Sequence, residues 1–84
     1  MKKLWEDSAW SEYENLQTKD KTYLKKLNAK IKQIERNGYD GAEPLKHDLS
    51  GLYSISVMKK DRLVFRIENE VLEIYSIRGH YSDR

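Results

Sequence analysis

The sequence has no cysteine, a single proline and only four glycines among its 84 residues. The lack of cysteine excludes a disulfide framework and a thiolate metal site, and we predict no metal and no cofactor. So few prolines and glycines exclude a low-complexity or linker segment, and no internal repeat is present. Residues 1–84 are therefore predicted to form one domain. Since so small a domain buries only about 60% of the surface that its unfolded chain exposes, an active site on it should be open.

Long apolar runs and a large excess of one charge are also lacking. No hydrophobic stretch approaches the roughly 18 residues that cross a membrane, and the first residues lack the apolar core of a signal peptide. We therefore expect a cytoplasmic protein without a membrane partner. Lysine and arginine number 16 against 14 aspartates and glutamates, a formal net charge of +2. Because the net charge argues only weakly for a nucleic-acid partner, the distribution of charge has to decide.

Apolar spacing in the first half of the chain predicts two amphipathic helices. The first should begin at Asp7 or Ser8, either of which can cap it, and end near residue 17. A break at 18–20 supplies a new cap for the second helix, which continues until Asn37-Gly38 stops it. The apolar faces consist of Ala9, Trp10, Tyr13 and Leu16 in the first helix, and of Leu24, Leu27, Ile31 and Ile34 in the second.

Basic side chains line the face of the second helix that is opposite its apolar stripe. This basic ridge consists of Lys21, Lys25, Lys32 and Arg36, with Lys26 and Lys30 beside it. One interpretation is a solvated face, because amphipathic helices often carry lysines outward. The other is a surface that contacts phosphates, because these six basic residues are accompanied by one acid, Glu35.

The second half of the chain predicts a loop followed by an antiparallel meander. Residues 39–50 should form the loop, because they combine glycine, proline and polar residues. Alternating or β-branched apolar residues predict strands at 52–57, 62–67 and 71–78, the last of them central or near-central in the sheet and ending before Gly79. A further short strand is expected over residues 2–5. The predicted fold class is α+β, in the order β-α-α-β-β-β, with two layers sharing one core.

Favourable charge pairing suggests a register for the last two strands, with a turn near Asn69-Glu70. The register pairs Arg66 with Glu73, Val64 with Tyr75, and Arg62 with Ile77. The face expected to cover the helices consists of Leu63, Phe65, Ile67, Leu72, Ile74 and Ser76. The opposite face is half polar, and functional residues should be sought there.

Three segments bring titratable or cationic groups to that face or to its rim. They are the loop with Glu43 and Lys46, the strand start with Arg62, and the end of the chain with Arg78, His80 and Tyr81. Gly79 tolerates backbone angles that allow a bulge, which would turn the groups beside it out of the strand's alternation. Taken singly, such a glutamate, arginine or histidine is ordinarily a solvated, ion-paired or structural residue.

In this order the residues resemble the YoeB toxins of bacterial toxin–antitoxin pairs, within the larger RelE-like group. The resemblance covers essentially the whole chain. It is carried by Glu43-Pro44-Leu45-Lys46-His47-Asp48-Leu49-Ser50-Gly51, Asp61-Arg62-Leu63-Val64-Phe65, His80-Tyr81, Trp5-Glu6-Asp7-Ser8-Ala9-Trp10 and Lys25-Lys26-Leu27-Asn28. It implies a microbial ribonuclease fold and an endonuclease that cuts ribosome-bound messenger RNA. It also implies a YefM-like antitoxin with an acidic carboxy-terminal segment, and operator DNA reached only through that antitoxin. Whether the protein forms a homodimer is left open at this point.

The resemblance also implies roles for individual residues. Glu43 corresponds to the general base, Arg62 to the arginine that stabilises the transition state, His80 to the general acid, and Tyr81 to the terminal aromatic residue. Lys46 corresponds to a lysine near the substrate. We predict that Arg78 also binds substrate and that the basic ridge contacts ribosomal RNA.

These residue types suit the chemistry on independent grounds. Cleaving RNA without a metal requires a base for the 2′-hydroxyl, a cation for the phosphorane and an acid for the leaving 5′-oxygen. Histidine is a natural acid near neutral pH, and the guanidinium fork matches two phosphate oxygens. A tyrosine at the rim can stack on a base.

The chain departs from the family in two places. Relatives usually carry a Ser-Arg-Arg-Ile strand where this chain has Ser54-Ile55-Ser56-Val57, so two cations that would face RNA are lost. Relatives also tend to end at the tyrosine, whereas residues 82–84 continue beyond it here. An alternative is therefore a catalytically weakened protein of this fold that binds the antitoxin and acts with it as a repressor of their operon.

Overall fold

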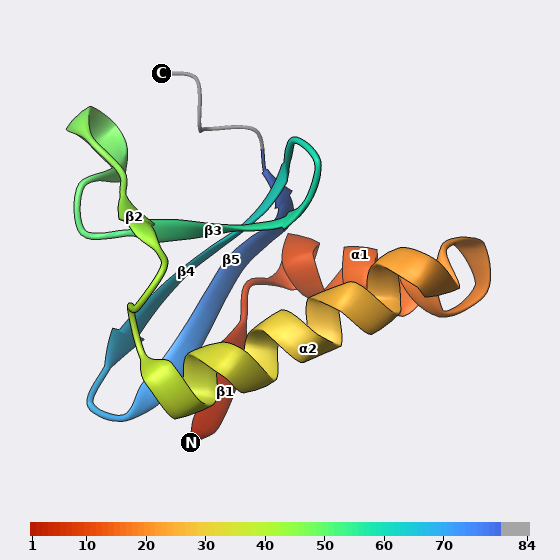
Figure 1. Cartoon of the computed structure of the whole chain (residues 1–84), viewed down its shortest axis with the longest axis horizontal. Helices are drawn as coiled ribbons and strands as arrows, with labels where there is room; N and C mark the ends of the chain where they lie inside the picture. The colour runs from red at the N-terminus through yellow and green to blue at the C-terminus, as the bar shows by residue number, and fades with distance from the viewer. Residues whose placement is uncertain (80–84) are drawn as a thin grey trace.

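The computed structural model describes residues 1–79, which form two helices and a five-stranded sheet (Figure 1). The elements are β1 (Lys2–Trp5), α1 (Asp7–Lys19), α2 (Lys21–Asn37), β2 (Glu43–Pro44), a 3₁₀ turn (His47–Leu49), β3 (Tyr53–Met58), β4 (Asp61–Glu68) and β5 (Val71–Gly79). The sheet order is β1-β5-β4-β3-β2, with β1 parallel to β5 and the other neighbours antiparallel. The predicted α+β class and near-central β5 are confirmed, and β2 is an additional strand inside the predicted loop.

Both helices cover one face of the sheet and share a core with it (Figure 1). The predicted signals of α2 are confirmed: the Asp20 side chain accepts a hydrogen bond from the Tyr23 amide at 3.0 Å, and the helix ends at Gly38, which has a φ of +63°. Neither helix within residues 1–79 is long and apolar enough to cross a membrane. The core consists of Ala9, Leu16, Tyr23, Leu27, Ile31, Ile34, Ile55, Leu63, Phe65, Leu72, Ile74 and Ile77.

Two predictions for α1 are wrong. The N-cap is Glu6 and makes no side-chain capping bond, whereas Asp7 or Ser8 was the predicted cap. The reason is that the Glu6 amide still bonds to the sheet, at 2.9 Å from the Ile74 carbonyl oxygen, so the helix starts at the next residue. Trp10, which the helical spacing places on the apolar face, is 43% exposed at the margin of the core.

The predicted register of β4 and β5 holds at the hairpin end and fails at the other end. Arg66 pairs with Glu73 as predicted, but Val64 pairs with Ser76 and Arg62 with Gly79. Two irregularities in the ladder each add one residue to β5, and a β-bulge of this kind shifts every later side chain. As a result the core contains Ile77, which is fully buried, in place of the predicted Ser76.

Candidate active site

Glu43 is carried by the two-residue strand β2 at the edge of the sheet. The pairing of β2 with β3 places Glu43 opposite Ser54, and the Leu45 amide donates to the Leu52 carbonyl oxygen at 2.9 Å, just beyond this pairing. The Glu43 side chain is 67% exposed. The carboxylate is therefore presented to solvent, as predicted, but a strand pairing holds its backbone.

Arg62 lies near the start of β4 and faces away from the helices, because its neighbour Leu63 belongs to the core. Its Nη2 atom lies 3.0 Å from Glu43 Oε1, its Nε donates to Ser54 Oγ at 2.9 Å, and its side chain is only 12% exposed. Ser54 is fully buried. The guanidinium is thus oriented from one side by a buried hydroxyl and from the other by an exposed carboxylate.

This arrangement joins two groups with complementary chemistry. A carboxylate can accept a proton, while a guanidinium can donate several hydrogen bonds to anionic oxygens in a fixed fork. Glu43 is the more exposed partner, so an incoming phosphate can compete with it for Arg62 without disturbing the bond to Ser54. The pair therefore suits a proton transfer next to a developing negative charge.

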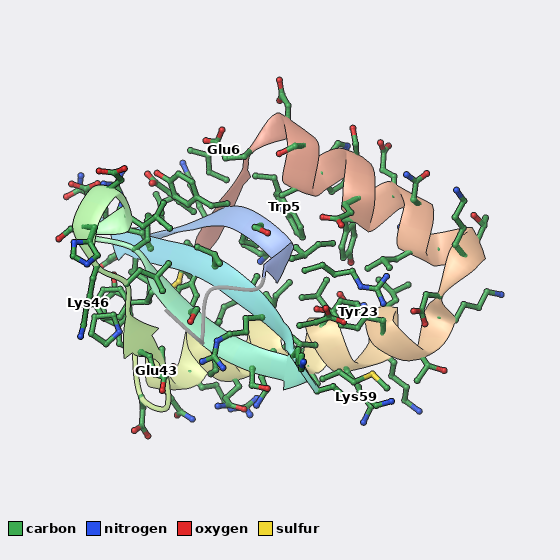
Figure 2. The ribbon with its side chains drawn as sticks, turned by 90° about the horizontal axis from the view of Figure 1, so that it is seen from above. Trp5, Glu6, Tyr23, Glu43, Lys46 and Lys59 are labelled. Carbon is green, nitrogen blue, oxygen red and sulfur yellow. The ribbon has the colours of Figure 1, made fainter. Side chains whose placement is uncertain are left out.

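Lys46 is exposed and follows Glu43 on the same side of the molecule, as Figure 2 shows. In this view both labelled side chains lie on the left, and Tyr23, a core residue of α2, lies to the right of the strands (Figure 2). The structure therefore leaves Lys46 accessible near the Glu43 end of the sheet.

Arg78 is engaged elsewhere. Its Nη2 lies 3.0 Å from Asp20 Oδ2, its Nε lies 3.6 Å from Asp61 Oδ2, and its guanidinium carbon lies 4.2 Å from the centre of the Tyr23 ring. These partners place the guanidinium at the junction of α1 and α2, away from Glu43. The predicted role of Arg78 in substrate binding remains a prediction, and these contacts suggest a different one.

The remaining predicted residues are distributed as follows. The predicted general acid His80 and the aromatic Tyr81 lie outside the described residues. All four residues of the basic ridge are exposed on α2. Since α2 covers the face of the sheet opposite Arg62, the ridge and the Glu43–Arg62 pair belong to different sides of the molecule.

Two residues near the site were not singled out from the sequence. Ser54 orients Arg62, and the signal for it was its position on the same face of β3 as the predicted site. Tyr39 is the second: its hydroxyl donates to the Ile67 carbonyl oxygen at 3.0 Å and accepts from the Ile67 amide at 2.7 Å. Its ring stacks on Tyr53, with centroids 3.9 Å apart. Tyr39 thus supports the start of β3, which in turn carries β2.

A second ion pair lies on the same face of the sheet. Arg66 Nη2 contacts Glu73 at 2.8 Å and Glu68 at 3.0 Å, and the Tyr75 hydroxyl donates to Glu73 at 3.1 Å. The hydrogen bond to Glu73 raises the pKa of Arg66. Burial, followed by the hydrogen bond to Glu73, raises the pKa of Tyr75. This cluster is consistent with a structural link between β4 and β5.

Comparisons with known proteins agree with this fold. Residues 5–81 match a family model described as the YoeB-like toxin of bacterial type II toxin-antitoxin systems. Toxin YoeB of Escherichia coli K12 is 38% identical over 84 residues, covering 96% of this chain and 100% of that protein. A YoeB/ParE toxin from Agrobacterium tumefaciens superposes with a TM-score of 0.89 at 34% identity, covering 96% of this chain and 100% of that one.

Staphylococcus aureus YoeB is similar as well. In a heterotetrameric complex with YefM it superposes with a TM-score of 0.87 at 33% identity, covering 96% of this chain and 98% of that one. It has also been solved as a dimer. Fold and comparisons together define a toxin of the bacterial type II toxin–antitoxin class. Within that class the chain belongs to the YoeB family, as its motifs predicted.

Proposed function

We propose that this protein is an endoribonuclease that cleaves messenger RNA on the ribosome and so inhibits translation. The observation that carries the proposal is the contact of 3.0 Å between Glu43 and Arg62, with the carboxylate exposed and the guanidinium held by Ser54. Glu43 takes the proton from the 2′-hydroxyl, and the 2′-oxygen attacks phosphorus. Arg62 stabilises the extra negative charge of the phosphorane, and His80 protonates the departing 5′-oxygen.

The exposure of the two partners supports this division of roles. A phosphate that enters the site displaces the Glu43 oxygen from Arg62 Nη2, which leaves the carboxylate beside the ribose as a free base. Ser54 retains Arg62 Nε throughout, so the guanidinium fork is already oriented when the phosphate arrives. Lys46 then contacts the RNA backbone as a flexible point charge, and Tyr81 stacks on a base.

The basic ridge supplies the attachment to the ribosome. Its four cations are exposed on the helix layer, on the opposite side of the molecule from Arg62. They dock on ribosomal RNA, while the ribosome presents the transcript to Glu43. Positioning of this kind is worth roughly 7–11 kcal/mol of a reaction barrier, which a small open site does not readily supply by itself.

The proposed partners follow from the relatives. Staphylococcus aureus YoeB forms a complex with YefM, and we propose that this chain binds a YefM-like antitoxin through an acidic carboxy-terminal segment, with operator DNA bound through the antitoxin. That relative also forms a dimer, and we extend this to the present chain. The site of action is the cytoplasm, where the ribosomes are.

One observation favours a second candidate function. Strand β3 carries no lysine or arginine between Tyr53 and Met58, so the face around Arg62 has little positive charge to hold RNA. A protein with this deficit could bind its antitoxin and repress their operon without cutting RNA.

A translation reaction with a defined message separates the two candidates. Primer extension on the message should reveal new 5′ ends when the protein is added, and none when it is added together with its antitoxin. Antitoxin binding without any new ends would support the binding module instead. Replacing the four ridge cations by glutamine should weaken co-sedimentation with ribosomes, and the loss should grow steeply as salt is raised.

A further inference from the structure

The carboxyl end of β5 is fastened to the junction of the two helices by a group of four residues. Arg78 contacts Asp20 at 3.0 Å and Asp61 at 3.6 Å, and its guanidinium lies over the Tyr23 ring at 4.2 Å. The Tyr23 hydroxyl also donates a hydrogen bond to the backbone carbonyl of Ile77. We call Asp20, Tyr23, Asp61 and Arg78 the Arg78 clamp.

Asp20 serves two elements at once. Its Oδ1 accepts the Tyr23 amide at 3.0 Å and caps α2, while its Oδ2 contacts Arg78. The bond from the Tyr23 amide, followed by that from Arg78, lowers the pKa of Asp20. Partial burial opposes the charge on Arg78, but Asp20 and Asp61 together raise the pKa of Arg78. The guanidinium is therefore a charged group that is balanced by two carboxylates.

The clamp lies where the backbone ladder is least regular. Two irregularities in the pairing of β4 with β5 lie between Phe65 and Arg62, so the ladder alone specifies this end of β5 weakly. Asp61 immediately precedes Arg62, and Gly79, which pairs with Arg62, immediately follows Arg78. The clamp therefore joins the two strands at the point that carries Arg62 and leads to His80, the next residue of the chain.

We propose that Arg78 is a positioning residue and does not bind substrate: Asp20, Tyr23 and Asp61 hold its guanidinium, and this fixes the end of β5 at Gly79, opposite Arg62. A phosphate that recruited Arg78 would have to compete with two carboxylates, one of which also caps α2. The proposal rests on the proposed ribonuclease function for its catalytic consequence. Its structural consequence can be measured without any activity.

The kinetic test uses Asp20→Asn, Arg78→Lys and the double variant in ribosome-dependent cleavage. Asparagine retains the ability to cap a helix but loses the negative charge, and lysine keeps the charge but loses the planar fork. Asp7→Asn, at an exposed position in the first turn of α1, is the matched control for net charge. Each single clamp variant should lower kcat about ten- to a hundredfold, as expected for a displaced reacting group, while KM stays within about twofold. The double variant should be no worse than the worse single variant.

If Arg78 instead bound substrate, the variants would show a different pattern of kcat and KM. Arg78→Lys would then raise KM, while Asp20→Asn, which releases the guanidinium, would leave kcat unchanged. That pattern would overturn the proposal.

Amide hydrogen exchange of the full chain by NMR provides the test that does not depend on activity. Asp20→Asn and Arg78→Lys should each accelerate exchange at the amides of residues 78 and 79 at least about tenfold, since the clamp opens without global unfolding. The Leu27 amide in α2 should keep its protection, which verifies the fold. Unchanged exchange at residues 78 and 79 in both variants would overturn the proposal whatever the kinetics. If the wild type cleaves nothing, the ribonuclease function fails and the exchange measurement still decides the role of Arg78.

Discussion

Strand β4 carries two arginines on the same face of the sheet, and each contacts a glutamate from another strand. The side chain of Arg62 is 12% exposed and that of its partner Glu43 is 67% exposed, whereas Arg66 is 37% exposed and its partner Glu73 is 19% exposed. In the first pair the cation is sheltered and the carboxylate is open to solvent. In the second pair the carboxylate is the sheltered group.

This difference indicates which pair can take part in chemistry. Glu73 lies opposite Arg66 in the β4–β5 ladder, so its contact with Arg66 links the two strands, and it also accepts the Tyr75 hydroxyl from its own strand. Glu43 is on a two-residue edge strand, where a substrate can reach it. The two pairs have the same residue types in different surroundings, and we therefore expect them to have different roles.

The largest effect is expected from separating charge and geometry at the two arginines. Arg62→Lys should lower cleavage of ribosome-bound message nearly as much as Arg62→Ala, by roughly 10³-fold, because lysine lacks the bidentate fork that stabilises phosphoryl transfer. Arg66→Lys should remain within about twofold of the wild type, as is usual for substitutions outside the site. Single-turnover rates of cleavage measure the effects of both substitutions. Arg62→Lys with most of the wild-type rate would mean that simple charge neutralisation suffices.

A smaller effect is expected from the hydroxyl that orients Arg62. Ser54→Ala removes the acceptor of the bond of 2.9 Å to Arg62 Nε, and hydrogen bonds to charged groups are worth about 1.5–3 kcal/mol, so kcat should fall at least about tenfold. Ser56→Ala is the matched control, because Ser56 pairs with Arg62 across the strands and is exposed. Equal rates for the two alanine variants would contradict a role for Ser54.

The smallest effect is expected on folding stability, through the contact between Asp20 and Arg78 of β5. Asp20 has a pKa below its ordinary value of 3.8, so its contribution to folding is present above that value and is lost as pH falls through the lowered pKa. Asp20→Asn should be less stable than the wild type near neutral pH, and the difference should be smaller at a pH below 3.8. Urea unfolding at both pH values measures the difference. A difference that is the same at both would exclude the carboxylate charge as its source.

Much of the helix layer could be predicted from the sequence because its signals are local. The cap at Asp20, the stop at Gly38 and the burial of Leu27 each depend on neighbouring residues and on the helical period. In the same way, opposite charges three positions from the turn residues 69 and 70 were sufficient to pair Arg66 with Glu73. The first cap of α1 failed because a tertiary bond from Glu6 to the sheet decides where that helix begins.

The remaining errors have a common cause. The alternation of side chains along a strand gives no indication in the sequence that a residue has been inserted. The prediction therefore assigned Ser76 to the core position that Ile77 occupies. The same bulges move Gly79 opposite Arg62 and place Arg78 beside Asp20, 58 positions earlier in the chain. The resemblance to YoeB toxins therefore indicated that Glu43 and Arg62 are candidate site residues, but the sequence did not indicate that Ser54 orients one of them or that Arg78 is held by Asp20.

The comparison between the two pairs is tested most directly by removing the charge of each glutamate in turn. Primer extension on ribosome-bound message should show that Glu43→Gln loses at least about 10²-fold in cleavage rate, since a general base contributes about 10²–10⁴-fold. Glu73→Gln, with the same change in charge on the same face of the sheet, should cleave within about twofold of the wild-type rate. Wild-type cleavage by Glu43→Gln, or an equal loss in both variants, would contradict the assignment of the Glu43–Arg62 pair as the active site.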